Sequence, residues 1–107
     1  ILEIRKYDPT RRSGINIKYD KAIIEICERM GLKVSYYDRR KEPREIKEKE
    51  GATIPWGVKV AVKRIGRVPD VIYHKGDWGK EPMIVLLAAD ALEAARIAIK
   101  IGDEYEV

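Results

Sequence analysis

Several residue types are scarce in this chain of 107 residues, and each scarcity excludes a class of protein. The single cysteine, Cys27, rules out an internal disulfide, and the single histidine, His74, rules out a zinc site built from several cysteines and histidines. A bound metal would therefore be held by carboxylates, as Mg²⁺ is. No apolar run is long enough to span a bilayer, and Glu3 interrupts the apolar start, so we expect a soluble, cytoplasmic protein without a membrane partner.

Amide side chains are also rare, because glutamine is absent and Asn16 is the only asparagine, whereas charged residues make up 37% of the chain. This bias is typical of hyperthermophile proteins and predicts a heat-adapted source. The net charge is +4, but basic and acidic residues are interleaved, which favours a solvated, salt-bridged surface over direct binding of nucleic acid. The densest positive stretch, from Arg5 to Lys21, would attract phosphate.

The hydrophobic pattern alternates between strand and helix periods. We expect strands at 14–19, 32–37, 70–74 and 83–87, helices at 20–31, 42–50, 54–65 and 90–101, and the last turns of a helix at 1–7. This alternation predicts a single α/β layered domain. The element order favours parallel strand pairing, although the short connection from His74 to Met83 also permits an antiparallel pair.

Two helices show apolar faces that predict core residues. Asp20 is a good N-cap and Gly31 a good stop for the first helix. Cys27 lies on its apolar face and is expected to be a small core residue, not a nucleophile. The inner faces are expected to consist of Ile23, Ile26, Cys27 and Met30 in the first helix and of Leu92, Ala95 and Ile99 in the last.

The segment 76–83 is the most unusual part of the chain. Its two glycines, Gly76 and Gly79, would let backbone N–H groups turn toward a ligand, and Lys80 supplies a positive charge, a combination that suits phosphate. It is not a Walker A motif, because Glu81 and Pro82 lead into a strand and not a helix. An ordinary turn with an exposed lysine is the alternative.

Three further residues could contact a ligand. Arg39 follows a strand end, where ligands of open α/β sheets bind, and its guanidinium could hold a phosphate, although a solvated charged loop explains it equally well. Trp56 could stack on a planar heterocycle, but a tryptophan at a helix start more often packs at the edge of the core. His74 could act as an acid or base, but a lone histidine is more often structural.

Five segments together carry a family resemblance. Residues 16–19, 34–39, 49–57, 69–73 and 76–84 resemble, in order and spacing, the C-terminal part of the archaeal ThiN domain. ThiN domains occur behind hydroxymethylpyrimidine phosphate kinases, where they act as thiamine-phosphate synthases, and behind helix-turn-helix domains in regulators that sense thiamine phosphates. The resemblance implies a three-layer α/β/α fold with a mixed, largely antiparallel sheet, similar to that of the class II aldolases.

The implied reaction joins hydroxymethylpyrimidine diphosphate to hydroxyethylthiazole phosphate and releases pyrophosphate, normally with Mg²⁺. The resemblance gives Lys80 and the backbone of Gly76–Gly79 a phosphate-holding role and makes Arg39 a second clamp. It implies that Asp77 or Glu81 is a metal ligand or polar anchor and that Asn16 reads the pyrimidine or a phosphate. The expected ligands are these two substrates or thiamine phosphate.

The resemblance covers only the C-terminal part of the domain, since a segment with basic and histidine residues would precede Ile1. We therefore expect an incomplete domain that has no synthase activity by itself. A ligand-sensing domain of a regulator and a non-catalytic stand-alone module remain alternatives. An unpaired sheet edge would favour a homo-oligomer.

Overall fold

A mixed four-stranded sheet forms the centre of the computed structural model, which describes residues 4, 6–45, 53–76 and 81–105. The strands β1 (Ser13–Lys18), β2 (Val34–Tyr36), β3 (Val71–His74) and β4 (Met83–Ala88) lie in the order β1-β4-β3-β2. β1 and β3 both run antiparallel to β4, and only β2 and β3 are parallel. The parallel pairing that the element order favoured is therefore wrong for most of the sheet. The chain between β3 and β4 is too short for a parallel crossover.

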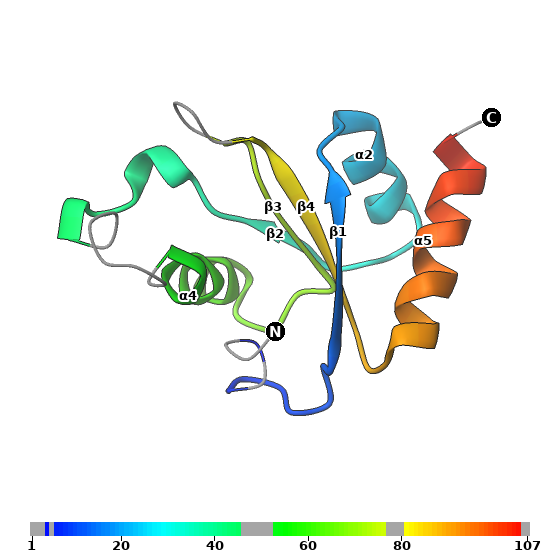
Figure 1. Cartoon of the computed structure of the whole chain (residues 1–107), viewed down its shortest axis with the longest axis horizontal. Coiled ribbons are helices and arrows are strands. Elements are labelled where there is room, and N and C mark those ends of the chain that lie inside the picture. The colour runs from blue at the N-terminus through cyan, green and yellow to red at the C-terminus, as the bar shows by residue number, and fades with distance from the viewer. Residues whose placement is uncertain (1–3, 5, 46–52, 77–80, 106–107) are drawn as a thin grey trace.

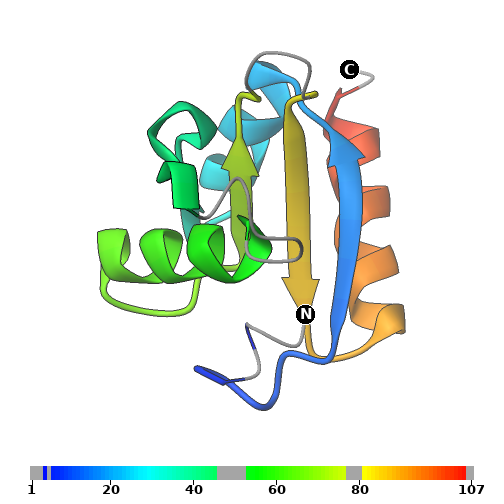
Figure 2. The same cartoon turned by 60° about the vertical axis from the view of Figure 1, so that its left-hand side comes forward.

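Helices cover both faces of this sheet and give three layers (Figure 1). Figure 2 shows α4 (Thr53–Ile65) on one face, with α2 (Lys21–Arg29) and α5 (Ala91–Tyr105) on the other. The predicted ends of α2 are confirmed, because Asp20 Oδ1 accepts a hydrogen bond from the backbone N of Ala22 at 2.9 Å and Gly31 has a φ of 81°. The α/β class expected from the sequence is thus correct.

Two hydrophobic cores hold the layers together. The core between the sheet and α2 and α5 contains the expected Cys27, which is fully buried. Burial raises the pKa of its thiol to about 11, so the thiolate is scarce at neutral pH and the group is unreactive. The second core lies between the sheet and α4 and includes Ile4, Tyr37, Val58, Ala61, Ile72 and Leu87.

The inner face of α5 differs from the sequence-based expectation. Leu92 and Ile99 are 60% and 65% exposed, whereas Ala94 and Ile101 are buried. The helix carries two apolar stripes, and the one with the small Ala94 and Ala98 allows closer packing on α2 and the sheet. The assignment of Leu92 and Ile99 to the core is therefore wrong, whereas Ala95 is half-buried.

Local differences concentrate after β2. This strand is shorter than expected, and Arg39–Lys41 form a short 3₁₀ helix, η1, capped by the Asp38 side chain. Arg44 and Glu45 are helical, but most of the expected surface helix lies outside the described residues. Glu42, expected at its solvated start, is instead 5% exposed.

The remaining expectations concern termini, edges and membranes. Ile4 is helical and buried, as expected for the end of a first helix, and its carbonyl accepts hydrogen bonds from the backbone N atoms of Tyr7 and Asp8. β1 and β2 are the outer strands of the described sheet, and association through an edge stays a prediction. Within the described part of the chain, no helix is long and apolar enough to cross a membrane.

Candidate functional site

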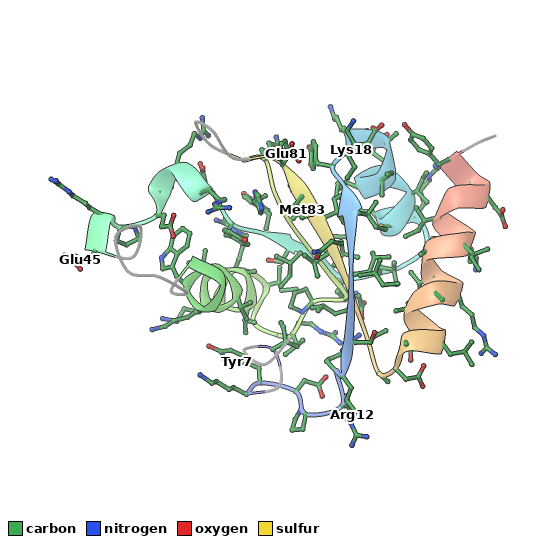
Figure 3. All side chains as sticks on the ribbon, in the orientation of Figure 1. Tyr7, Arg12, Lys18, Glu45, Glu81 and Met83 are labelled. Atoms are coloured by element: carbon green, nitrogen blue, oxygen red, sulfur yellow. The ribbon has the colours of Figure 1, made fainter. Side chains whose placement is uncertain are left out.

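The candidate site lies where the parallel strands β2 and β3 end side by side. The pairing of Tyr36 with Tyr73 in these strands brings Tyr37 and His74, the next residues along, to the same end of the sheet. The antiparallel pairing of His74 with Met83 brings the end of β3 and the start of β4 to the same place. Glu81 and Lys18 lie at this end in Figure 3, while Tyr7 and Arg12 lie at the opposite end. The strand geometry thus gathers the segments in which the sequence predicted ligand contacts.

Tyr37 is the centre of the site. Its side chain is 6% exposed, and its ring centroid lies 5.3 Å from that of His74 and 5.8 Å from that of Trp56, which meets it edge-on. A Cβ atom added at Gly57 would lie 2.6 Å from Cζ of Tyr37, so the ring rests directly on the backbone of α4. Glycine at position 57 is what allows Tyr37 to occupy this place.

Two charged side chains reach the buried part of the site without satisfying all their polar atoms. Nε of Arg39 and both carboxylate oxygens of Glu42 are buried, and they find no hydrogen-bond partner among the described residues. Burial raises the pKa of the Tyr37 hydroxyl, the charge of Arg39 opposes this shift and the charge of Glu42 adds to it, so both charges act on Tyr37. A buried polar atom without a partner costs about 1–3 kcal/mol. Such atoms are expected to meet a ligand or ordered water.

His74 is held as a neutral imidazole. Its side chain is buried, and its Nδ1 accepts a hydrogen bond from the backbone N of Gly76 at 3.1 Å. Burial, and secondarily the positive charge of Arg39, lower the pKa of His74 below its ordinary value. The proton of the neutral ring is therefore on Nε2, which makes this atom a hydrogen-bond donor at neutral pH.

Asn16 borders the same region from β1, the outer strand on the opposite edge of the sheet from β2. It lies on β1 with its side chain exposed, and it lines a cavity of about 280 Å³ together with Tyr37. The other walls are apolar and come from Ile4, Val58, Ile72, Val85 and Leu87. An apolar cavity with a few polar groups is the usual form of a small-ligand site.

The structure describes four of the seven predicted ligand residues, and the ligand-binding role of all seven stays a prediction. Asn16 and Arg39 both lie next to Tyr37, Gly76 adopts a φ of 83° beside His74, and Glu81 is exposed at the same end of the sheet. The remaining predicted ligand residues, Asp77, Gly79 and Lys80, lie outside the described residues.

Sequence reasoning missed Tyr37 and Glu42. The sequence pattern gives Tyr37 a strand end without a role, and it gives Glu42 the start of a solvated helix, because Ile46 is the only apolar residue of the expected helix 42–50. Its position three residues after the predicted arginine clamp is the one sequence signal that could have drawn attention to Glu42. The described residues hold no group of three or more His, Cys, Asp or Glu side chains placed to bind a metal ion, and Mg²⁺ stays a sequence-based prediction.

Comparisons with known proteins identify the family of the chain. The sequence profile of the family described as "Thiamine-phosphate synthase ThiN" matches residues 1–100. The chain is 54% identical over 106 residues to the thiamine-phosphate synthase ThiN of Methanothermobacter thermautotrophicus. The aligned region covers 99% of this chain and 56% of that protein. It is also 41% identical over 96 residues to the bifunctional thiamine biosynthesis protein ThiDN of Methanocaldococcus jannaschii. Here the aligned region covers 90% of this chain and 22% of that protein.

Solved structures show the same relationship. The C-terminal domain of a phosphomethylpyrimidine kinase superposes with a TM-score of 0.86 at 50% identity, over 94% of this chain and 56% of the other. A second solved C-terminal domain gives the same TM-score of 0.86 at 39% identity, over 99% of this chain and 55% of the other. The chain therefore spans about half the length of these structures. On the strength of its sequence and its fold, the chain belongs to the thiamine-phosphate synthase ThiN family.

Proposed function

We propose that the chain forms part of a thiamine-phosphate synthase and that the region around Tyr37 binds phosphorylated thiamine or its pyrimidine and thiazole precursors. One observation carries the proposal: buried polar atoms of Arg39 and Glu42 that have no partner among the described residues lie close to the Tyr37 ring. Tyr37 also lines the cavity of about 280 Å³ to which Asn16 contributes. The family relationship supplies the chemical identity of the ligand.

The chemistry of these side chains divides between the two ends of such a ligand. The guanidinium of Arg39 suits a phosphate, because it can donate two parallel hydrogen bonds to phosphate oxygens. The carboxylate of Glu42 would repel a phosphate but accepts hydrogen bonds from an amino group, which the pyrimidine carries. Asn16 offers two donors and an acceptor at the mouth of a cavity lined by apolar side chains that suit a planar ring.

The loop between β3 and β4 completes the proposal. Lys80 and the backbone of residues 76–79 would hold the phosphate, and Asp77 or Glu81 would bind Mg²⁺, whose charge would offset that of a diphosphate. Holding two anionic substrates side by side is the main physical demand of the reaction. We also propose that the complete domain has the class II aldolase-like topology that the family resemblance implies.

Calorimetric titration with thiamine phosphate and with thiamine tests the proposal. We expect the phosphorylated ligand to bind more tightly than thiamine, and Lys80→Ala and Arg39→Gln each to weaken it about tenfold, because a charge-assisted hydrogen bond contributes about 1.5–3 kcal/mol. Asn16→Ala should weaken both ligands alike, since this residue is assigned to the ring.

A matched control is Lys100→Ala, which removes one exposed positive charge from α5, on the opposite face of the sheet from Tyr37. It should leave both affinities unchanged. Equal affinities for the two ligands, or equal losses in Lys80→Ala and Lys100→Ala, would show that no phosphate site exists here.

A further inference from the structure

Basic residues are distributed unevenly over the molecule, and their excess lies in one layer of the fold. The chain has 22 basic and 18 acidic residues. Residues 53–68, which comprise α4 and the short segment after it, contain four basic residues and no acidic one. These four account for the whole net charge of +4, and the rest of the chain is balanced. The interleaving of basic and acidic residues is therefore interrupted at α4.

Three of these four side chains form an exposed basic line, which consists of Lys59, Lys63 and Arg67. Lys59 and Lys63 lie one helical turn apart, about 6 Å along the axis, and Arg67 follows just beyond the helix end. All three are exposed, whereas Val58 and Ala61 on the inner side of α4 are buried against the sheet. Because α4 is the outer layer on its side of the sheet (Figure 2), the basic line lies on the surface of the molecule.

The basic line has no ionic partner within the described part of the chain. None of its three side chains forms an ion pair or hydrogen bond with another described residue. The fourth cation, Arg64, differs, because its Nε donates to the Tyr36 carbonyl oxygen at 3.2 Å and its Cζ lies 4.0 Å from the Tyr36 ring centroid. Arg64 therefore holds α4 against β2, and the basic line makes no contact of this kind.

Two structural explanations account for only part of the basic line. Cations in the last turn of a helix interact favourably with its dipole, which explains Lys63 but neither Lys59, in the middle of α4, nor Arg67, after its end. Charged surfaces of heat-adapted proteins are stabilised by networks of ion pairs, but such networks need acidic partners. Like charges one helical turn apart are slightly destabilising, and an anionic partner would remove this cost.

The shape of this surface favours an extended anion over a small one. Small-molecule sites are concave, whereas the outer face of a helix is convex, and no residue of the basic line borders the cavity beside Tyr37. The axial separation of Lys59 and Lys63 is below the Debye length of about 8 Å at physiological salt, so their fields add. A row of added fields on a convex surface matches an anion whose charges are themselves arranged in a row.

The same surface lacks the side chains that recognise nucleotide bases. None of the exposed large hydrophobic side chains of the described residues belongs to α4. Stacking of single-stranded bases needs such aromatic faces. Contacts between basic side chains and backbone phosphates need none, and they carry no sequence information. The basic line thus suits the backbone of a duplex better than a single strand.

We propose that the outer face of α4 binds the sugar–phosphate backbone of double-stranded nucleic acid without reading its sequence. Lys59, Lys63 and Arg67 donate hydrogen bonds to backbone phosphates. A pI near 9.2 with basic residues along one helix is the charge distribution of nucleic-acid-binding domains. The expectation of a salt-bridged surface rested on interleaved charges, which α4 does not have. The proposal is independent of thiamine phosphate binding, because none of the three residues belongs to the Tyr37 site.

Fluorescence anisotropy of a labelled DNA duplex of arbitrary sequence, titrated with the full chain, tests the proposal. We expect the affinity to fall as salt is raised from about 50 to 200 mM, because phosphate contacts release counterions. The variant Lys59→Ala/Lys63→Ala/Arg67→Ala should lose at least about tenfold in affinity at the lower salt concentration. Its plot of log Kd against log salt should be shallower by about 2–3 units. The three positions are exposed, so the variant should fold normally.

The matched control is Lys21→Ala/Arg96→Ala/Lys100→Ala, which removes three exposed cations from α2 and α5 on the other face of the sheet. Its net charge equals that of the α4 variant, and it should keep the affinity and the salt dependence of the wild type. Equal losses in the two triple variants would reduce the effect to net charge and overturn the proposal. Absence of binding at about 50 mM salt, or a preference for one duplex sequence, would also overturn it.

Two competitors separate this surface from other binding modes. Poly-L-glutamate that displaces the duplex as well as unlabelled duplex does, at equal charge concentration, would assign α4 to an acidic protein partner and overturn the proposal. Thiamine phosphate should not displace the duplex. Displacement by thiamine phosphate would place the nucleic acid at the Tyr37 site and not on α4, whereas failure of thiamine phosphate to bind at all would leave the duplex result unchanged.

Discussion

At the scale of single residues, the fold favours the neutral form of the His74 side chain. Its Nδ1 accepts a hydrogen bond from the Gly76 backbone, and burial disfavours the charged ring. The pKa of His74 is therefore lower in the folded protein than the value of about 6.5 in the unfolded chain. A site that needs a neutral imidazole would use this property at neutral pH.

This pKa shift predicts a pH dependence of stability. Below pH 6.5 the unfolded chain takes up the proton first, so the free energy of unfolding should fall as the pH decreases through this range. Above about pH 7 the ring is neutral in both states and contributes no dependence. His74→Asn keeps an acceptor near Gly76 but does not titrate. Urea unfolding from pH 8 to pH 5 should therefore show a steeper loss for the wild type, and parallel curves would contradict the assignment.

At the scale of elements, α5 shows that helical periodicity does not identify the buried face. Both of its apolar stripes have helical spacing, and the sequence pattern predicts that the stripe with the larger side chains, Leu92 and Ile99, is the buried one. The structure buries the other stripe, in which Ala94 and Ala98 let the helix approach its neighbours. Packing distance, a property of two elements together, decided between the stripes.

A matched pair of substitutions in α5 measures this difference. Ile101→Ala should lower the free energy of unfolding by about 2–5 kcal/mol, because it removes buried apolar groups and leaves a cavity. Ile99→Ala, the same chemical change at an exposed position of the same helix, should change it by less than about 0.5 kcal/mol. Denaturant unfolding of both variants checks the prediction, and similar losses would mean that Ile99 is covered in solution.

At the scale of the whole molecule, the end of the sheet opposite the site is closed by Arg11. Its Nη2 lies 2.6 Å from Oδ1 of Asp70, and its Nη1 donates to the carbonyl oxygen of Leu87 at 3.1 Å. The other carboxylate oxygen of Asp70 accepts a hydrogen bond from the backbone N of Lys33. Arg11, which precedes β1, thus joins the end of β4 to Asp70 at the start of β3, and Asp70 in turn holds Lys33 at the start of β2. This arginine of the positive stretch serves the fold.

Removal of this link should destabilise the protein as a whole. Arg11→Ala leaves Oδ1 of Asp70 without its charged partner and should cost about 2 kcal/mol, as expected for a charge-assisted hydrogen bond at a partly buried position. Arg12→Ala, one residue further on and exposed, should cost less than about 0.5 kcal/mol. Thermal unfolding of the two variants compares them directly, and equal melting temperatures would show that the pair contributes nothing.

The sequence by itself determined the local structure and the family of this protein. Capping residues such as Asp20 and Gly31 fix helix ends through the local backbone and hydrogen bonds to near neighbours. The helix ends can therefore be recognised from a few consecutive residues of the sequence. The segments that resemble the ThiN domain, among them 34–39 and 69–73, identified the family for the same reason, because they are contiguous patterns.

Only the tertiary structure decided the strand order, the buried face of α5 and the surroundings of Tyr37. Each depends on residues distant in the chain, as when Gly57 makes room for Tyr37. Glu42 is buried although its local sequence is that of a solvated helix start. Such placements follow from the packing of whole elements, whose free energy exceeds the local preference of any single residue.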